Sequence, residues 1–270
     1  MGTIQAVIFD VDGTLYDYQE GKIHQSTIKS IQQLKRRGIL VILASARAYP
    51  ELSAACIREL AADYYVMAGG HSIQDGEGKV LCAVRFSHEQ TERMVQLACQ
   101  YDAGLNLKYE HHCCLYRHAD KMQEIFTNIG PGLPGTSLRC PGMEMHHQLL
   151  PLGFTLWGVD GIREQICTQL EQYPTEFRIE RYGNGVVADV YHQQVNKMTG
   201  LSMLADRLGL EREVCVAFGD GSNDVEMIRW AGIGVAMGNA CEELKQVADQ
   251  VCGSSWEDGI ANTLEELELI

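Results

Sequence analysis

The sequence predicts an α/β fold in which a doubly wound, parallel sheet is interrupted by a smaller α+β insertion. Three observations support this prediction. Apolar, β-branched runs alternate with segments of helical spacing up to about residue 70, the alternation then stops, and it resumes at Asn196. We therefore expect a core domain at residues 1–80 and 190–270, with an inserted α+β domain at residues 81–189.

The first part of the core should consist of strands and helices in strict alternation. The expected strands are residues 4–9, 39–44 and 64–67, and the expected helices are 24–37 and 51–61. Gly38 should end the first helix because a glycine readily adopts the left-handed conformation that follows a helix. Right-handed crossovers then place the carboxyl ends of all these strands at one edge of the sheet.

The insertion should form an α+β domain of its own. A hairpin is expected around the Asp75-Gly76 turn at residues 72–86, and a Pro/Gly-rich connector is expected at 130–135. Strand-like runs occupy residues 105–109, 113–116, 154–159, 177–181 and 186–190, and helical spacing occupies 87–102, 120–128 and 161–172.

The second part of the core restores the alternation. We expect a helix at 197–208, a strand at 214–218, a helix ending at Trp230 and a turn at 235–240. A further helix, a short strand at 250–252 and an acidic helix at 257–267 with a solvated face complete the sequence.

The charge balance restricts the possible partners. Lys and Arg number 22 against 36 Asp and Glu, a formal net charge of −14. Such an excess argues against nucleic acid or an anionic membrane as partner, and it requires any phosphate site to be built locally from a cation and N–H groups. With no apparent signal peptide and no apolar run long enough to cross a membrane, we expect a cytoplasmic protein.

The ten cysteines are scattered and include no Cys-x-x-Cys pair, so we interpret them as reduced thiols that pack in the core. One cluster gathers His111, His112, Cys113, Cys114 and His118. Because adjacent residues of a strand point to opposite faces, this run needs irregular backbone to converge on one zinc ion. We do not expect a zinc site there.

Aspartates follow two of the predicted strands. Asp10 and Asp12 come at the end of the first strand, and Asp220 and Asp224 follow the strand at 214–218. The carboxyl ends of strands are where open α/β sheets bind ligands, and clustered carboxylates remain ionised only near a cation. Each aspartate alone could belong to a turn or a helix cap, but oxygen-rich strand ends also suit Mg²⁺.

Two further residues complete this edge of the sheet. Ser45 follows the strand at 39–44, where it could cap a helix or bind phosphate oxygens. Lys197 opens a helix, where a cation has no capping value, so it is either exposed or turned inward to neutralise a phosphate. If this edge of the sheet has no function, the polar residues at all four positions must have gathered there by chance.

Four segments of the sequence resemble, in the same order, the four motifs of the haloacid dehalogenase superfamily. They are Asp10-Val11-Asp12-Gly13-Thr14-Leu15, Ser45-Ala46-Arg47, Lys197 and Gly219-Asp220-Gly221-Ser222-Asn223-Asp224. The position of the insertion and the segment 235–240 resemble its Cof-type phosphatase branch. Two features depart from that branch: Ser45-Ala46 stands where Thr-Gly is usual, and the insertion shows no recognisable substrate pattern. The resemblance implies a Rossmann-like core with an α+β cap that closes over the site.

The resemblance also implies roles for individual residues. Asp10 would be the nucleophile that forms a phosphoaspartate, and Asp12 the general acid and base. Mg²⁺ would be held by Asp10, Asp12 through its backbone carbonyl, and Asp220, with Asp224 in support. Phosphate oxygens would be bound by the Val11 and Ala46 N–H groups, Ser45, Lys197 and Asn223. Arg47 is a candidate for a salt bridge, with no further role.

The resulting expectation is a Mg²⁺-dependent phosphatase that acts on small phosphorylated metabolites, sugar phosphates above all. A phosphomutase is the nearest alternative because related mutases share the four motifs. A non-catalytic phospholigand-binding protein is disfavoured by the intact aspartates and lysine, and a dehalogenase by Asp12, Gly13 and Thr14, which serve phosphate and metal.

Overall fold

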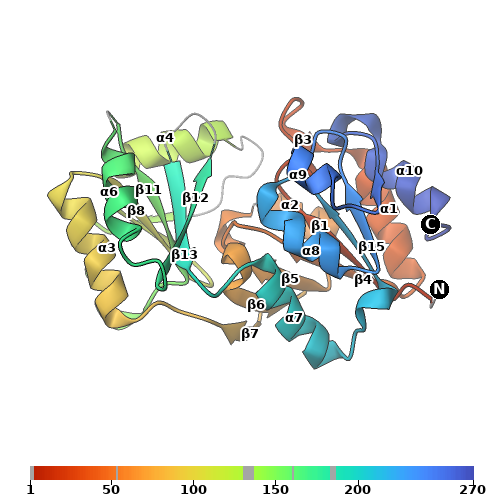
Figure 1. The fold of residues 1–270 in the computed structure, drawn as a ribbon, viewed down its shortest axis with the longest axis horizontal. Helices are drawn as coiled ribbons and strands as arrows, with labels where there is room; N and C mark the ends of the chain where they lie inside the picture. The colour runs from red at the N-terminus through yellow and green to blue at the C-terminus, as the bar shows by residue number, and fades with distance from the viewer. Residues whose placement is uncertain (1–2, 53, 130–136, 160, 183–186) are drawn as a thin grey trace. The chain divides into compact units, whose positions relative to one another are not determined.

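The computed structural model describes residues 3–52, 54–129, 137–159, 161–182 and 187–270 (Figure 1). The chain forms two compact units. One comprises Met1–Ala46, Ala54–Leu81 and Lys197–Ile270, and the other Arg47–Ser53 and Cys82–Asn196. The second unit thus includes a short segment, Arg47–Ser53, that the sequence analysis placed in the core domain.

The first unit is built on an eight-stranded sheet with the order β16-β15-β14-β1-β4-β5-β6-β7. The neighbours from β16 to β5 run parallel, and β6 is antiparallel to β5. The strands are β1 (Ala6–Asp10), β4 (Leu40–Ala44), β5 (Tyr64–Met67), β6 (Ser72–Asp75), β7 (Val80–Ala83), β14 (Cys215–Gly219), β15 (Ile233–Ala236) and β16 (Gln250–Val251). A separate small hairpin joins β2 (Tyr16–Asp17) to β3 (Lys22–Ile23).

The helices of this unit pack in two groups, as expected for a sheet covered on both faces. The first group is α1 (Gln25–Arg36), α2 (Ala54–Leu60) and α10 (Gly259–Glu266), and the second is α7 (Lys197–Leu208), α8 (Val225–Trp230) and α9 (Glu242–Lys245). In α1 the buried residues Ile28, Ile31 and Leu34 recur at helical spacing, and Gly38 follows with φ +77°. This face and this stop are the features that the sequence predicted.

Three expectations in the core need correction. Val235 and Ala236 end strand β15, which lies between β14 and β16, so the expected turn begins only at Met237. The helix expected at 51–61 is divided, because Tyr49–Glu51 form a 3₁₀ turn, η1, before α2. The acidic helix α10 begins at Gly259 and not at residue 257, because Ser255–Glu257 form a separate 3₁₀ turn, η5. Its acidic face with Glu265 and Glu266 is exposed, as expected.

The second unit contains a six-stranded sheet with the order β10-β9-β8-β11-β13-β12. Its elements are α3 (His88–Gln100), β8 (Gly104–Lys108), β9 (Cys113–Arg117), α4 (Ala119–Ile129), β10 (Ser137–Arg139), α5 (Met145–Gln148), β11 (Gly153–Trp157), α6 (Ile162–Leu170), β12 (Phe177–Tyr182) and β13 (Val187–His192). The short elements β10 and α5, of three and four residues, were not expected, because such short segments carry no recognisable periodicity. The expected connector at 130–135 lies outside the described residues, as does residue 186 of the last expected strand.

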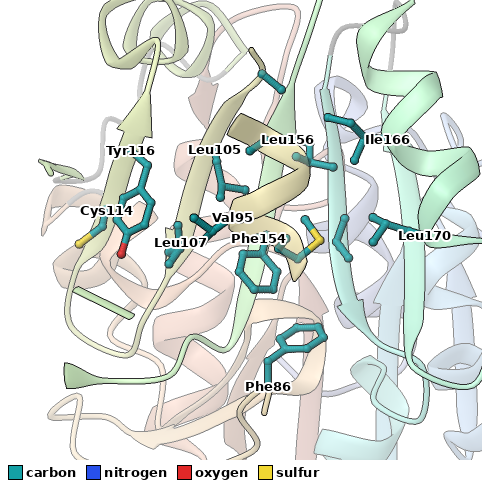
Figure 2. Packing of buried hydrophobic residues seen from close by; sticks show 14 of the residues in the cluster. Phe86, Val95, Leu105, Leu107, Cys114, Tyr116, Phe154, Leu156, Ile166 and Leu170 are labelled. Carbon is teal, nitrogen blue, oxygen red and sulfur yellow. The ribbon is translucent and has the colours of Figure 1, made fainter. Parts of the chain in front are cut away.

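The two faces of this sheet differ in chemistry because side chains alternate along each strand. One face packs with α3 and α6 into an apolar cluster that includes Phe86, Leu105, Phe154 and Ile166 (Figure 2). The opposite face carries the buried polar residues Asn106, Lys108, Thr155, Asp189 and Tyr191.

A network of polar contacts links the buried residues of this second face, and of the side-chain polar atoms in these five described residues only Asn106 Oδ1 lacks a hydrogen-bond partner. Lys108 Nζ donates to Asp189 Oδ2 at 2.7 Å and to Tyr191 Oη at 3.0 Å. Glu51, from the Arg47–Ser53 segment, accepts a hydrogen bond from Asn106 Nδ2 at 3.1 Å and lies 3.8 Å from Lys108 Nζ. The buried lysine therefore has two anionic partners, which burial of a charge requires.

The cysteines described by the structure are free thiols. Cys113, Cys114, Cys167 and Cys215 are buried, as expected, whereas Cys99 and Cys241 are exposed. No helix within the described ranges is both long and apolar enough to cross a membrane.

Candidate active site

The strand order places the predicted site residues at one edge of the core sheet. Strand β1 lies between β14 and β4, and its last residue, Asp10, pairs in register with Ala44. Ser45 follows that pair by one residue. On the other side Phe9 pairs with Phe218, so Asp220 begins the loop just beyond the end of β1. The parallel pairing thus aligns the three predicted strand ends.

Three carboxylates and one lysine converge at this edge. Oxygen atoms of Asp10, Asp220 and Asp224 all lie within 4.8 Å of one another. Lys197, the first residue of α7, donates from Nζ to Asp10 Oδ1 at 2.5 Å and to Asp224 Oδ1 at 2.7 Å. Its side chain is only 3% exposed, so the helix-start lysine is turned inward.

The loop after β14 is shaped around Asp224, which lies in the 3₁₀ turn η4 (Ser222–Asp224). Asp224 Oδ2 accepts hydrogen bonds from the N–H groups of Asp220 at 3.1 Å and Gly221 at 3.0 Å. Both oxygens of this carboxylate are therefore engaged by protein groups, which fixes the loop that carries Asp220.

The loop after β1 approaches Asp220 from the other side. Thr14 Oγ1 donates to Asp220 Oδ1 at 3.2 Å. Gly13 has φ +84°, and a Cβ at this position would lie 2.3 Å from Asp220 Oδ2. Only glycine combines this backbone conformation with so close an approach.

Burial and mutual repulsion perturb the carboxylates. Burial raises the pKa of Asp10 well above its usual range, and the nearby Asp224 adds to the rise while Lys197 opposes it. The same two causes raise the pKa of Asp220 to about 7. In the protein alone, Asp10 and Asp220 therefore each bind a proton more tightly than a free aspartate does.

The donor set fits Mg²⁺. Three clustered carboxylates supply the hard oxygen ligands that this ion prefers, and a divalent cation would relieve the repulsion that helps to raise the pKa values of Asp10 and Asp220. The side chain of Asp12 is not part of this cluster. That Asp12 contributes its backbone carbonyl stays a prediction.

Asp12 lies two residues beyond the strand end and is partly exposed. Its Oδ1 accepts a hydrogen bond from the hydroxyl of Tyr18, which the β2–β3 hairpin brings back toward the loop. The Asp12 carboxylate is therefore partly exposed and held in place by the Tyr18 hydroxyl.

The other predicted residues occupy the same strand ends. Val11 is fully buried, Ser45 is 1% exposed, and Ala46 and Asn223 are partly exposed. The Ser45 backbone is fixed by its N–H to Val66 O at 2.9 Å and by Gly69 N–H to its carbonyl at 2.9 Å. Arg47 belongs to the second unit.

Two residues of the site escaped the sequence reasoning. Tyr18 is the partner of Asp12, and nothing in the spacing of the sequence announces it. Asn239 donates from Nδ2 to the Gly13 carbonyl at 2.8 Å and accepts from Ser255 N–H at 3.1 Å, which ties the turn after β15 to the Asp10 loop. The segment 235–240 that resembles the Cof-type branch was the available signal for Asn239.

A family model described as haloacid dehalogenase-like hydrolase matches residues 7–264. The chain belongs to this family. The haloacid dehalogenase-like hydrolases most similar to it include YkrA of Bacillus subtilis, which is provisionally named a phosphatase. It is 30% identical over 98% of this chain and 98% of its own. A Streptococcus pyogenes protein with a provisional name as a bifunctional phosphatase and peptidyl-prolyl cis-trans isomerase is 28% identical over 99% of this chain. The chain spans only 54% of that protein.

Solved structures give the same result. BT1666 of Bacteroides thetaiotaomicron, described among phosphatases of this superfamily, matches with a TM-score of 0.81 and 26% identity. The match covers 99% of this chain and 96% of that one. The subclass IIB sugar phosphatase BT4131 matches with a TM-score of 0.82 and 25% identity. The match covers 98% of this chain and 100% of that one. The predicted α/β fold and the prediction of a phosphatase of this family are confirmed.

Proposed function

We propose that this protein, as a phosphatase of the haloacid dehalogenase-like family, hydrolyses small phosphorylated metabolites in two steps. Mg²⁺ would be bound, and the intermediate would be a phosphoaspartate on Asp10. The observation that carries the proposal is the contact of a buried lysine, Lys197, with both Asp10 and Asp224 beside Asp220. A salt bridge that served stability alone would need neither a third carboxylate nor a position at the strand ends.

In the first step Asp10 attacks the phosphorus atom and the bond to the leaving oxygen breaks. Asp10 is the last residue of a buried strand, and Lys197 holds its Oδ1, so the other oxygen has a fixed direction. Asp12 donates a proton to the leaving oxygen and then removes a proton from the water that hydrolyses the intermediate. The hydrogen bond from Tyr18 orients Asp12 for both transfers.

The transferring phosphoryl group needs neutralising donors around it. We assign these to Lys197, Ser45, Asn223 and the N–H groups of Val11 and Ala46. Lys197 reaches Asp10 from the start of α7, and the other four lie at or just beyond the aligned strand ends. Asp10, the Asp12 carbonyl and Asp220 would hold Mg²⁺, and Asp224 would support them by fixing Lys197 and the Asp220 loop. When bound, Mg²⁺ offsets the repulsion between the nucleophile and the phosphate dianion.

Sugar phosphates are the substrate class we propose first. The structurally similar BT4131 is described as a sugar phosphatase, which supports this choice. A phosphoglycolate phosphatase of Methanosarcina acetivorans, 25% identical over 98% of this chain, supports a broader panel of small phosphomonoesters. Phosphate release across such a panel, compared by kcat/KM, would rank the classes.

The two aspartates can be separated by their leaving-group dependence. Asp10→Asn should release no leaving group from any substrate. Asp12→Asn should give a burst of about one equivalent of nitrophenol from nitrophenyl phosphate, because nitrophenolate leaves without a proton, and should then stop as phosphoenzyme. A sugar phosphate should give no burst with Asp12→Asn.

A burst from Asp10→Asn, or equal slowing of both substrates by Asp12→Asn without phosphoenzyme, would contradict these roles. Wild-type protein should release inorganic phosphate without added bisphosphate. A requirement for a bisphosphate, with return of the phosphoryl group to another hydroxyl, would instead identify a mutase.

A further inference from the structure

A second group of ligand-type side chains lies in the inserted unit, on helices α3 and α5. Glu92 on α3 faces the adjacent residues His146 and His147 on α5. Glu92 Oε1 lies 3.0 Å from His146 Nε2 and 3.5 Å from His147 Nδ1, and the three ligand atoms are all within 4.8 Å of one another. His88, one helical turn before Glu92, has its ring centroid 6.1 Å from that of His147.

These distances match the spacing of ligands around a tetrahedral ion. Two ligand atoms bound to zinc at about 2.0–2.1 Å are separated by roughly 3.4 Å at the tetrahedral angle. The two measured separations from Glu92 Oε1, 3.0 and 3.5 Å, lie on either side of this value. The two imidazole rings are only 4.0 Å apart, centre to centre. Two protonated rings would repel at this distance, whereas one divalent cation can be shared by both.

His146 is held in a ligand-ready orientation. Its side chain is 2% exposed, and its Nδ1 lies 2.9 Å from the hydroxyl of Tyr116 on β9. The backbone N–H of His146 donates to the same hydroxyl at 2.9 Å. Metal-binding histidines usually have their second ring nitrogen fixed by such a partner. His147 is 55% exposed, so the opposite side of the cluster is open to solvent and gives an ion an entry path.

Two other groups of ligand-type side chains come equally close in the described part of the chain. One is the active-site cluster, and the other is Asp17, Glu20 and His24. Both are dominated by carboxylates, which suit Mg²⁺, Ca²⁺ or Mn²⁺, whereas a site with two imidazoles favours Zn²⁺ and similar transition metals. The cluster on α3 and α5 is thus chemically distinct from the catalytic site.

We propose that Glu92, His146 and His147, with His88 within reach as a fourth ligand, form a binding site for Zn²⁺ or a similar transition-metal ion. The ion would tie α5 to α3 within the inserted unit. This proposal does not depend on the proposed reaction.

The test is titration of the metal-free full-length protein with Zn²⁺, in excess Mg²⁺ so that the active-site carboxylates are occupied. Wild type should bind one Zn²⁺ and gain thermal stability on binding. His147→Ala, which changes an exposed side chain, should weaken binding by about 10-fold or more, and Glu92→Gln should do the same. His111→Ala, an exposed histidine of the same unit, is the matched control and should bind as wild type does.

Co²⁺ identifies the ligand atoms, because thiolate ligands add charge-transfer bands that nitrogen and oxygen ligands lack. We expect spectra without such bands. Unchanged Zn²⁺ affinity in His147→Ala, loss of binding in His24→Ala, thiolate bands with Co²⁺, or no Zn²⁺ binding by wild type would each overturn the proposal. A His147→Ala protein that is destabilised equally with and without Zn²⁺ would show a purely structural role and would also overturn it.

Discussion

Asp220 should titrate near neutral pH in the metal-free protein, and the titration should be visible in thermal stability. Burial and the neighbouring Asp224 raise its pKa from the ordinary 3.8 to about 7. A carboxyl group with a raised pKa binds its proton more tightly in the folded protein than in the unfolded chain. The resulting stabilisation is complete below about pH 4 and is lost as the pH rises through about 7.

The size of the effect follows from the two pKa values. At about 1.4 kcal/mol for each tenfold change in the ionisation constant, the loss that accumulates between about pH 4 and about pH 7 amounts to about 4 kcal/mol. For a protein of this size the melting temperature should fall by roughly 10 °C. Asp10, whose pKa is also raised by burial, changes stability in the same direction. Mg²⁺ requires the ionised carboxylates, so its apparent affinity should fall as the pH drops below 7.

The assay is a series of thermal melts from about pH 4 to about pH 9, with chelator or with Mg²⁺. Wild type in chelator should lose stability across this range, and Mg²⁺ should restore it at the alkaline end. Asp220→Asn in chelator should lose clearly less stability over the same pH range, because an amide replaces the titrating carboxyl group. Asp206→Asn, at an exposed position of α7, should follow wild type. An identical pH dependence in Asp220→Asn and wild type would refute the reasoning.

Three further predictions concern neighbouring residues. Lys197→Ala should lower kcat by on the order of 10²-fold or more. It should also lower the melting temperature, because buried Asp10 and Asp224 lose their cationic partner, whereas Lys22→Ala at an exposed position should not. Retained turnover in Lys197→Ala would contradict this prediction. Gly13→Ala should abolish activity because its Cβ would meet Asp220, whereas Gly38→Ala, with φ +77° and open space around it, should cost only about 1–2 kcal/mol of stability. Tyr18→Phe should lower kcat with little change in KM, and unchanged kcat would show that Asp12 needs no partner.

The sequence was most informative where local signals agreed with the tertiary fold. The strand before Asp10 and the helix that starts at Lys197 are long, periodic and bounded by clear signals, and both appear where they were expected. The convergence of Asp10, Asp220 and Asp224 follows from the ends of neighbouring parallel strands.

The sequence was least informative where a contact depends on one turn. Tyr18 reaches Asp12 through a hairpin with only two residues in each strand, too short for a periodic pattern. Helix α5 has four residues, and its pairing with Glu92 joins positions 54 residues apart. The inward turn of Lys197 is likewise tertiary, because helix position alone favours neither an exposed nor a buried lysine.

The Arg47–Ser53 segment has a consequence for anyone who wishes to shorten this protein. The chain passes between the two units at four points, and two of them directly adjoin Ala46 and Lys197. Excision of 82–196 alone would leave Glu51 behind without Asn106 and Lys108, its partners on the sheet of the second unit. A minimal catalytic fragment would therefore need two separate grafts, one to replace 47–53 and one to rejoin residues 81 and 197.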